Sequence, residues 1–166
     1  MTDHSDELPL DGFLRVNALL LPVATTPLLV PMSAIAEIVS DDISITPFEA
    51  KDERFYGWIR WRNQTLPLLS FEGLSGTTQL PFTAASHIVI LNAIGDASKS
   101  SFYGLVLQGF PRRIDIANSG GTRPIEKQKD VPGVLYNAEL GAELVRIPDF
   151  EFLEMLIAEA PAPNDG

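Results

Sequence analysis

Few residues of this 166-residue chain have the types and spacing that catalysis or metal binding needs. His4 lies in a charged N-terminal stretch and His87 opens the apolar run "SHIVIL", so no histidine pair has the spacing of metal ligands. The stretch "GLSG" lacks the spacing and the following helix of a nucleophile elbow. Neighbouring carboxylates, which suit solvated loops better than a facing catalytic pair, occur at Asp41/Asp42 and Asp52/Glu53. We therefore expect no catalytic residue, no metal and no cofactor.

The stretch "YGWIRWRN" offers binding chemistry instead. Successive side chains of a β-strand alternate between faces, so Ile59 and Trp61 can pack into a core. Trp58, Arg60 and Arg62 then share the opposite, wetter face. Tryptophan and arginine are enriched at the centres of protein interfaces, so this face is a candidate partner-binding surface. The alternative is that the arginines form salt bridges with acids of the same chain.

The composition narrows the choice of partners. The chain has 12 Lys plus Arg against 22 Asp plus Glu, and its net charge of -10 disfavours nucleic acid and anionic membrane surfaces. It has no cysteine, which fits a reducing compartment. The stretch "MTDHSDELPLDG" has neither the basic nor the apolar part of a secretory signal, and prolines interrupt the most apolar stretch. We expect a cytoplasmic protein without a membrane-spanning helix.

Short apolar runs bounded by Gly, Pro, Asn or Asp predict an all-β domain. We expect helix only at 32–38, where apolar residues recur at helical spacing after a proline, and at 150–158, behind the acidic start Asp149. The polar loop 118–130 is predicted to be mobile. The stretches "GWIRWRNQTLPLLSFEGL" and "GVLYNAELGAELVRIPDFEFL" echo each other, which favours two small packed barrels over one sandwich.

Several stretches in order resemble the landmarks of the CheW-like domain, which forms the chemotaxis coupling protein and the regulatory domain of its partner histidine kinase. They are "LLVPMSAIAEIVSDDISITPF", "YGWIRWRNQTLPLLSFEGL", "HIVIL", "FYGLVLQGFPRRIDI" and "GVLYNAELGAELVRIPDFEFLEML". Two motifs are the most specific. The first is a proline between apolar residues with a glutamate six positions later, at Pro31 and Glu37. The second is a hairpin with an arginine five positions before a proline, at Gly57, Ile59, Arg62 and Pro67. The resemblance covers residues 13–157, with 1–12 as a flexible N-terminus and 158–166 as a disordered tail.

The resemblance implies two packed five-stranded SH3-like barrels, with a short helix after the second strand and a short C-terminal helix. It also implies a non-enzymatic scaffold that joins the cytoplasmic tip of a methyl-accepting chemoreceptor to the regulatory domain of a CheA-like histidine kinase. The receptor tip would dock in the groove between the barrels and the kinase domain on the exposed edge of one barrel. Carried over by position, the partner-binding residues include Ile35, Glu37, Ile38, Arg62 and Phe110.

The chain departs from the family pattern at several of these places. Asn63 replaces the usual glycine after the hairpin arginine, and it still tolerates a left-handed turn. Ser70–Phe71 and Gln108 replace acidic positions. Arg112 and Arg113 replace small or apolar residues on the groove side, which makes Arg113 a further candidate partner-binding residue. The chain therefore resembles a divergent or accessory coupling protein, of the kind found in type IV pilus chemosensory systems that drive twitching motility.

Two other functions remain open from the residues. A small hydrolytic or ligand-binding barrel would show a deep apolar pocket with convergent polar groups. A generic peptide-binding SH3-like module would show an aromatic groove for proline-rich ligands.

Overall fold

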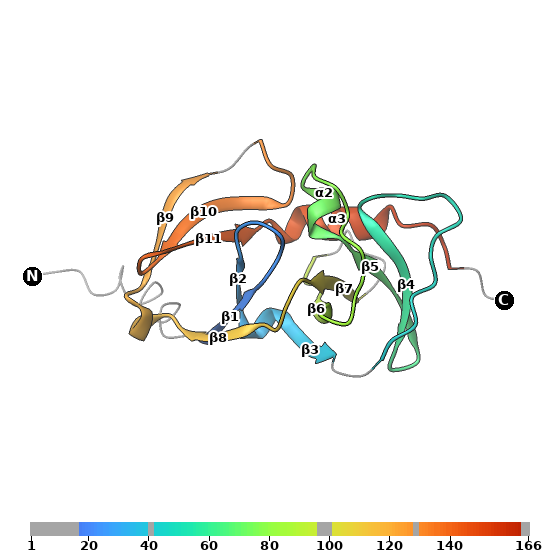
Figure 1. Ribbon diagram of the computed structural model, residues 1–166, viewed down its shortest axis with the longest axis horizontal. Coiled ribbons are helices and arrows are strands. Elements are labelled where there is room, and N and C mark those ends of the chain that lie inside the picture. The colour runs from blue at the N-terminus through green and yellow to red at the C-terminus, as the bar shows by residue number, and fades with distance from the viewer. Residues whose placement is uncertain (1–16, 40–41, 96–100, 128–129, 164–166) are drawn as a thin grey trace, which may run out of the picture.

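A computed structural model of the chain describes residues 17–39, 42–95, 101–127 and 130–163. Its strands form two sheets that lie side by side (Figure 1). Sheet A contains, in spatial order, β8 (Arg112–Asp115), β1 (Asn17–Leu21), β2 (Leu28–Pro31), β11 (Glu143–Pro148), β10 (Val134–Leu140) and β9 (Thr122–Lys127). Sheet B contains β3 (Ile35–Val39), β6 (His87–Asn92), β7 (Phe102–Leu107), β5 (Gln64–Leu69) and β4 (Phe55–Trp61). The N-terminal stretch 1–12 lies outside the described residues.

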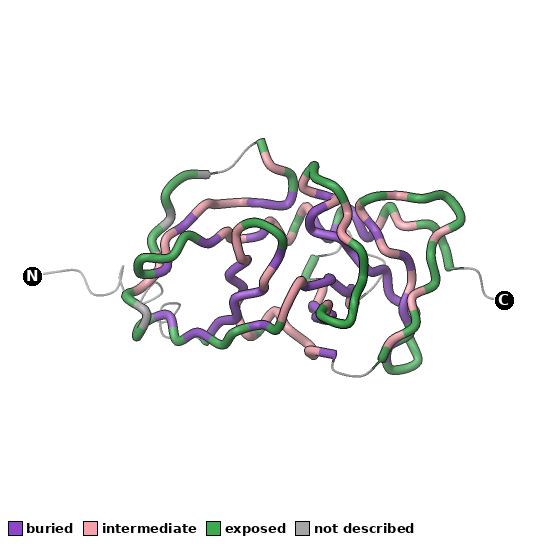
Figure 2. Tube along the Cα trace, in the orientation of Figure 1, coloured by how far each residue is buried: buried purple, intermediate pink, exposed green. Residues whose placement is uncertain are grey.

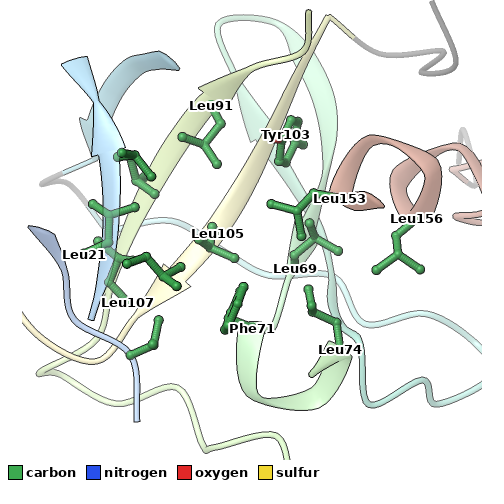
Figure 3. Close-up of a cluster of buried hydrophobic side chains, with 14 of the residues drawn as sticks. Leu21, Leu69, Phe71, Leu74, Leu91, Tyr103, Leu105, Leu107, Leu153 and Leu156 are labelled. Atoms are coloured by element: carbon green, nitrogen blue, oxygen red, sulfur yellow. The ribbon is translucent and has the colours of Figure 1, made fainter. Parts of the chain in front are cut away.

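Each sheet encloses a core of its own, and a third core joins the two sheets. On β1, Ala18 and Leu20 face the interior of sheet A, whereas Leu19 and Leu21 face sheet B, because side chains alternate along a strand. The joining core also takes side chains from β5, β6, β7 and both α-helices, and Figure 3 shows part of it around Leu105 and Tyr103. Figure 2 shows the buried segments running through the middle of both halves. The prediction of an all-β fold with two packed barrels is confirmed, and we call the two halves barrel A and barrel B.

The number of strands in barrel A differs from the prediction. The described residues give sheet A six strands, where five were expected, and sheet B five. The extra strand arises because β9 occupies part of the predicted polar loop 118–130 and pairs with β10. The prediction of a loop is therefore wrong for residues 122–127, which form a strand. Before β9, the chain makes one 3₁₀ turn, η2 (Ala117–Ser119).

The helix predicted at 32–38 is wrong in length. Only the 3₁₀ turn η1 (Met32–Ala34) forms there, and residues 35–39 form β3. The β-branched residues Ile35, Ile38 and Val39 favour a strand, and β3 pairs with β6 along its length. Pairing with β6 therefore decided the structure of residues 35–39, and the helical spacing of their apolar residues did not.

Both sequence echoes fold as a hairpin followed by a helix, and each barrel contains one copy. Hairpin β4–β5 leads into α2 (Phe71–Leu74), and hairpin β10–β11 leads into α3 (Phe150–Ala158). The Ser70 hydroxyl accepts from the Gly73 N–H at 3.1 Å. The Asp149 carboxylate accepts from the Phe152 N–H at 3.1 Å. The C-terminal helix is confirmed, whereas α2 was not predicted, since helix was expected only at 32–38 and 150–158.

Two buried glutamates bind backbone groups across the junction between the barrels. Glu72 on α2 accepts from the Ala24 N–H of the β1–β2 loop at 2.9 Å. Glu154 on α3 accepts from the N–H groups of Ile94 and Gly95 at 3.1 and 2.6 Å. Both glutamates are 3% exposed. Burial, with a smaller contribution from the charge of Glu154, raises the pKa of the neighbouring Tyr103. These bonds, together with the joining core, hold the barrels in one arrangement.

Candidate functional site

The β4–β5 hairpin carries the candidate surface, and its strand part lies as predicted. Ile59 and Trp61 are buried in the core of barrel B. Trp58 and Arg60 lie on the opposite face, where Trp58 is half-buried and Arg60 is exposed. Arg62 differs from the prediction, because β4 ends at Trp61 and Arg62 belongs to the turn. It therefore does not share the strand face of the other two.

The turn has an unusual backbone for its residues. Arg62 and Asn63 connect the paired residues Trp61 and Gln64, with φ angles of 48° and 63°. Two consecutive left-handed residues are typical of a type I′ turn, whose twist matches that of the flanking strands. Asparagine adopts this conformation readily, as the sequence indicated, but arginine does so rarely. Arg62 is thus placed by the turn in a direction that a strand position would not give.

The guanidinium of Arg62 has two partners. It donates to Glu37 on β3 at 2.8 Å, and it lies over the Trp61 ring at 4.6 Å from the centroid. Because β3 and β4 are the two edges of sheet B, this ion pair spans the seam at which barrel B closes. The intramolecular salt bridge left open by the sequence is therefore present for Arg62. Arg60 instead contacts the Thr65 hydroxyl at 3.5 Å.

Ile35 and Ile38 flank Glu37 on the same edge strand. Both are half-buried and pack against the core that joins the barrels. In the β3–β6 ladder, Ile35 pairs with Leu91 and Ile38 with Val89. The edge of barrel B thus presents two partly exposed aliphatic side chains on either side of the Glu37–Arg62 ion pair.

Phe110 lies elsewhere, in the connection between β7 and β8 that leads from barrel B to barrel A. Its side chain is 71% exposed, and its ring meets the His87 ring edge-on at 5.2 Å. The connection is held to barrel A by the Gln108 N–H, which donates to the Pro22 carbonyl at 2.8 Å. Phe110 is therefore an exposed aromatic side chain at the crossing between the barrels.

Arg112 and Arg113 lie on opposite faces of β8, although both were expected on the groove side. Arg113 pairs with Leu19, which faces barrel B, so Arg113 lies on the face of β8 that is turned toward barrel B. Arg112 pairs with Leu20, which faces the interior of barrel A, and it reaches Glu143 at 2.8 Å at the end of the barrel. The prediction for Arg112 is wrong because neighbouring residues of a strand cannot share a face.

The structure thus brings some of the candidate residues together and separates others. Glu37 and Arg62 are in direct contact, and Ile35 and Ile38 adjoin them on β3. Trp61 was expected only in the core, and its contact with the Arg62 guanidinium was missed, since strand alternation does not indicate contacts made by the following turn. The remaining candidates occupy three other places, with Trp58 and Arg60 on the outer face of β4, Phe110 in the β7–β8 connection and Arg113 on β8.

No helix among the described residues is long and apolar enough to cross a membrane. Two barrels that share a joining core, with a hairpin-and-helix unit in each, define a double-barrel β domain. The chain belongs to the CheW-like domain family, whose model matches residues 17–154.

Comparison with solved structures supports the same fold. The chain is similar to the scaffolding protein TtCheW from Thermoanaerobacter tengcongensis, with 19% sequence identity and a TM-score of 0.63. The similarity covers 81% of this chain and 89% of that chain. No curated protein matches the sequence.

Proposed function

We propose that the chain is a non-enzymatic adaptor that couples chemoreceptors to a histidine kinase in bacterial chemosensory signalling. The observation that carries the proposal is the match of the CheW-like family model to residues 17–154. The similar structure is that of a scaffolding protein, which supports a role in assembly rather than in catalysis. The partners are the regulatory domain of a CheA-like kinase and the cytoplasmic tip of a methyl-accepting chemoreceptor, and the adaptor acts in the cytoplasm.

The partner surfaces are assigned from the contacts above. Arg62 holds a fixed position over Trp61 beside Glu37, and Ile35 and Ile38 add aliphatic area next to this ion pair. An arginine held in place before binding loses little conformational entropy when a partner docks, which favours a hot-spot role.

Phe110, Arg113, Trp58 and Arg60 are proposed as secondary contacts. Phe110 is exposed at the crossing between the barrels, and Arg113 lies on the face of β8 that is turned toward barrel B. Arg113 changes the polarity of the groove relative to the family pattern, and Gln108 replaces an acidic position of that pattern. This change fits a divergent or accessory coupling protein, and we assign the chain to a chemosensory system linked to type IV pili and twitching motility.

Reconstitution from purified components tests the proposed function. The full chain is mixed with the regulatory domain of a histidine kinase and with the cytoplasmic fragment of a chemoreceptor from the same genome. Analytical ultracentrifugation should then detect a binary complex with each partner and a ternary complex with both. A chain that forms neither binary complex with any kinase and receptor of that genome contradicts the proposal, as does turnover of a small substrate that depends on the folded chain.

A further inference from the structure

On the outer edge of β4, the backbone N–H and C=O of one residue, Arg60, have no hydrogen-bond partner among the described residues. Pro67 lies opposite Trp58 in the β4–β5 ladder, so the Trp58 backbone groups face away from β5. They exchange two bonds of 2.8 Å with Thr46 instead. Because the direction of backbone groups alternates along a strand, the N–H and C=O of Arg60 face the same outer edge. No described residue pairs with them there.

The segment around Thr46 covers this edge beside Trp58 but does not continue along β4 to Arg60. Thr46 and Trp58 form a single antiparallel bridge, and continuing its register would place Ser44 opposite Arg60. That pair does not form, and the two segments diverge to enclose a cleft of about 850 Å³. This volume lies within the usual range of ligand pockets, which is roughly 300–1,000 Å³. Figure 1 shows β4 on the side of barrel B that faces away from barrel A.

The beginning of the same strand is covered by another segment. The Gln79 side chain donates to the carbonyl groups of Glu53 and Phe55 at 3.1 and 2.7 Å. Proteins commonly cover strand edges in this way to prevent unwanted pairing. The open stretch is therefore confined to the end of β4 at Arg60, beside the cleft.

The Arg60 side chain favours an acidic neighbour at the open position of β4. Arg60 is exposed, and among the described residues its side chain makes one long contact, to the Thr65 hydroxyl at 3.5 Å, and no ion pair. On another wall, Asp52 and Glu159 are both paired with Arg54, at 2.8 and 3.3 Å. A hydrogen bond from Arg54 lowers the pKa of Asp52, which keeps that carboxylate ionised and engaged. Asp42, Glu49 and Lys51 also line the cleft, so its lining as a whole has more acidic than basic residues. The preference for an acidic side chain therefore concerns the one position beside Arg60, where opposite charges on neighbouring strands stabilise pairing.

An aromatic surface adjoins Arg60 in the cleft. Trp58 lines the cleft, and its ring is supported by Phe48 at a centroid distance of 5.3 Å. A strand added to β4 would place alternate side chains over Trp58 and Arg60, because these two residues share a face.

We propose that this cleft binds an extended segment of a partner protein, which adds to sheet B as a strand at Arg60 and places an acidic side chain beside the Arg60 guanidinium. Backbone hydrogen bonds supply the affinity in this mode of recognition, and the neighbouring side chains supply the specificity. The site lies apart from the Glu37–Arg62 ion pair and does not rest on the proposed coupling function.

A peptide titration tests the site directly. The full chain, labelled with ¹⁵N, is titrated with the acetylated and amidated heptapeptide Thr-Val-Thr-Glu-Thr-Val-Thr, and with the same peptide carrying Lys in place of Glu. The Glu peptide should shift the Arg60 amide and the Trp58 indole resonances and slow amide exchange at Arg60. It should bind at least about tenfold more tightly than the Lys peptide.

Two variants separate the site from general charge attraction. Arg60→Gln should remove the difference between the peptides, whereas Arg123→Gln, which changes an exposed arginine on barrel A, should retain it. The proposal is overturned if neither peptide moves the Arg60 resonance at several millimolar, if the Lys peptide binds as well or better, or if Arg60→Gln changes nothing. Shifts at Arg60 that appear on concentrating the protein alone would show that the occupant is a second copy and would also overturn it.

Discussion

Two arginine–glutamate ion pairs, one on each barrel, have nearly the same geometry. The Arg62–Glu37 pair has an N–O distance of 2.8 Å and side-chain exposures of 65% and 36%. The Arg112–Glu143 pair has the same distance and exposures of 60% and 44%. Coulomb attraction and solvent screening should therefore contribute about equally to both, roughly 0.2–1 kcal/mol of stability each.

The two pairs differ in what holds the arginine. Arg62 is set by a left-handed turn and lies over the Trp61 ring, whereas Arg112 extends from a regular strand. The ring lies beneath the Arg62 guanidinium, and the Arg62 side chain remains 65% exposed. Two ion pairs of equal length can thus differ in how firmly the arginine is positioned before a partner binds. For Arg62, the left-handed turn and the Trp61 ring make this difference. The predictions that follow test this comparison.

The largest effect is expected from Gly57→Ala, which should disrupt the strand that leads to the Arg62 turn. An added Cβ would lie 2.1 Å from the Thr46 carbonyl oxygen, and Gly57 has a φ of +136°. Overlap and backbone strain together should lower the free energy of unfolding by about 3 kcal/mol or more. Urea denaturation measures this change.

Gly76→Ala is the matched control, since Gly76 also has a positive φ of +99° but no atom within 4 Å of an added Cβ. It should have a clearly smaller effect, of about 1 kcal/mol. Equal losses for the two variants would mean that the close approach of Thr46 does not constrain β4.

A smaller effect is expected from Asn63→Val in the turn. Asn63 has a φ of 63°, and a β-branched residue resists this conformation. The free energy of unfolding should fall by about 1–2 kcal/mol, whereas Asn63→Gly should retain or increase it. Thermal unfolding followed by circular dichroism measures both, and an unchanged Asn63→Val melting curve would argue against the turn as the element that sets Arg62.

The contact between Arg62 and Trp61 should appear as a coupling that Arg112 lacks. A double-mutant cycle with Arg62→Ala and Trp61→Leu should give a coupling free energy of about 0.5–1 kcal/mol. Cycles for Arg62 with Glu37 and for Arg112 with Glu143 should agree with each other within error. If the Arg62–Trp61 coupling is zero, the distinction between the two arginines is lost.

Salt should produce the smallest effect and should act alike on both ion pairs. Raising the ionic strength from 0.1 to 1 M shortens the Debye length from about 10 Å to about 3 Å. Each ion-pair coupling should then fall by a few tenths of a kcal/mol. The coupling free energy of Arg62 with Trp61 should fall less, because dispersion also contributes to the ring contact. Repeating the double-mutant cycles at both salt concentrations tests whether the ion-pair couplings fall more than the ring coupling.

Strand periodicity and helix starts could be predicted from the sequence because they are local. Alternation placed Ile59 and Trp61 in the core, and the acidic start Asp149 correctly marked α3. The same rule, applied to Arg112 and Arg113, would have placed them on opposite faces, so that error lay in the reasoning and not in the sequence.

The features that were missed depend on contacts between distant residues. Residues 35–39 formed a strand because β6 lies beside them, and Glu37 meets Arg62 across 25 positions. Neither fact follows from a local pattern. The left-handed backbone at Arg62 has a local cause, because the pairing of Trp61 with Gln64 leaves a two-residue turn, but the arginine itself gives no sign of it.

The most direct test of the account measures the affinity of Arg62→Ala and Arg112→Ala for the kinase regulatory domain and for the receptor tip, with the melting temperature of each variant. Each variant removes one exposed ion pair of equal length, so both should melt within a few degrees of the unmodified protein. A hot-spot arginine contributes about 2 kcal/mol, so Arg62→Ala should bind one partner roughly thirty-fold more weakly, while Arg112→Ala binds normally and Arg60→Ala loses less than Arg62→Ala. Normal binding of both partners by Arg62→Ala, or equal losses for Arg62→Ala and Arg112→Ala, would contradict the account.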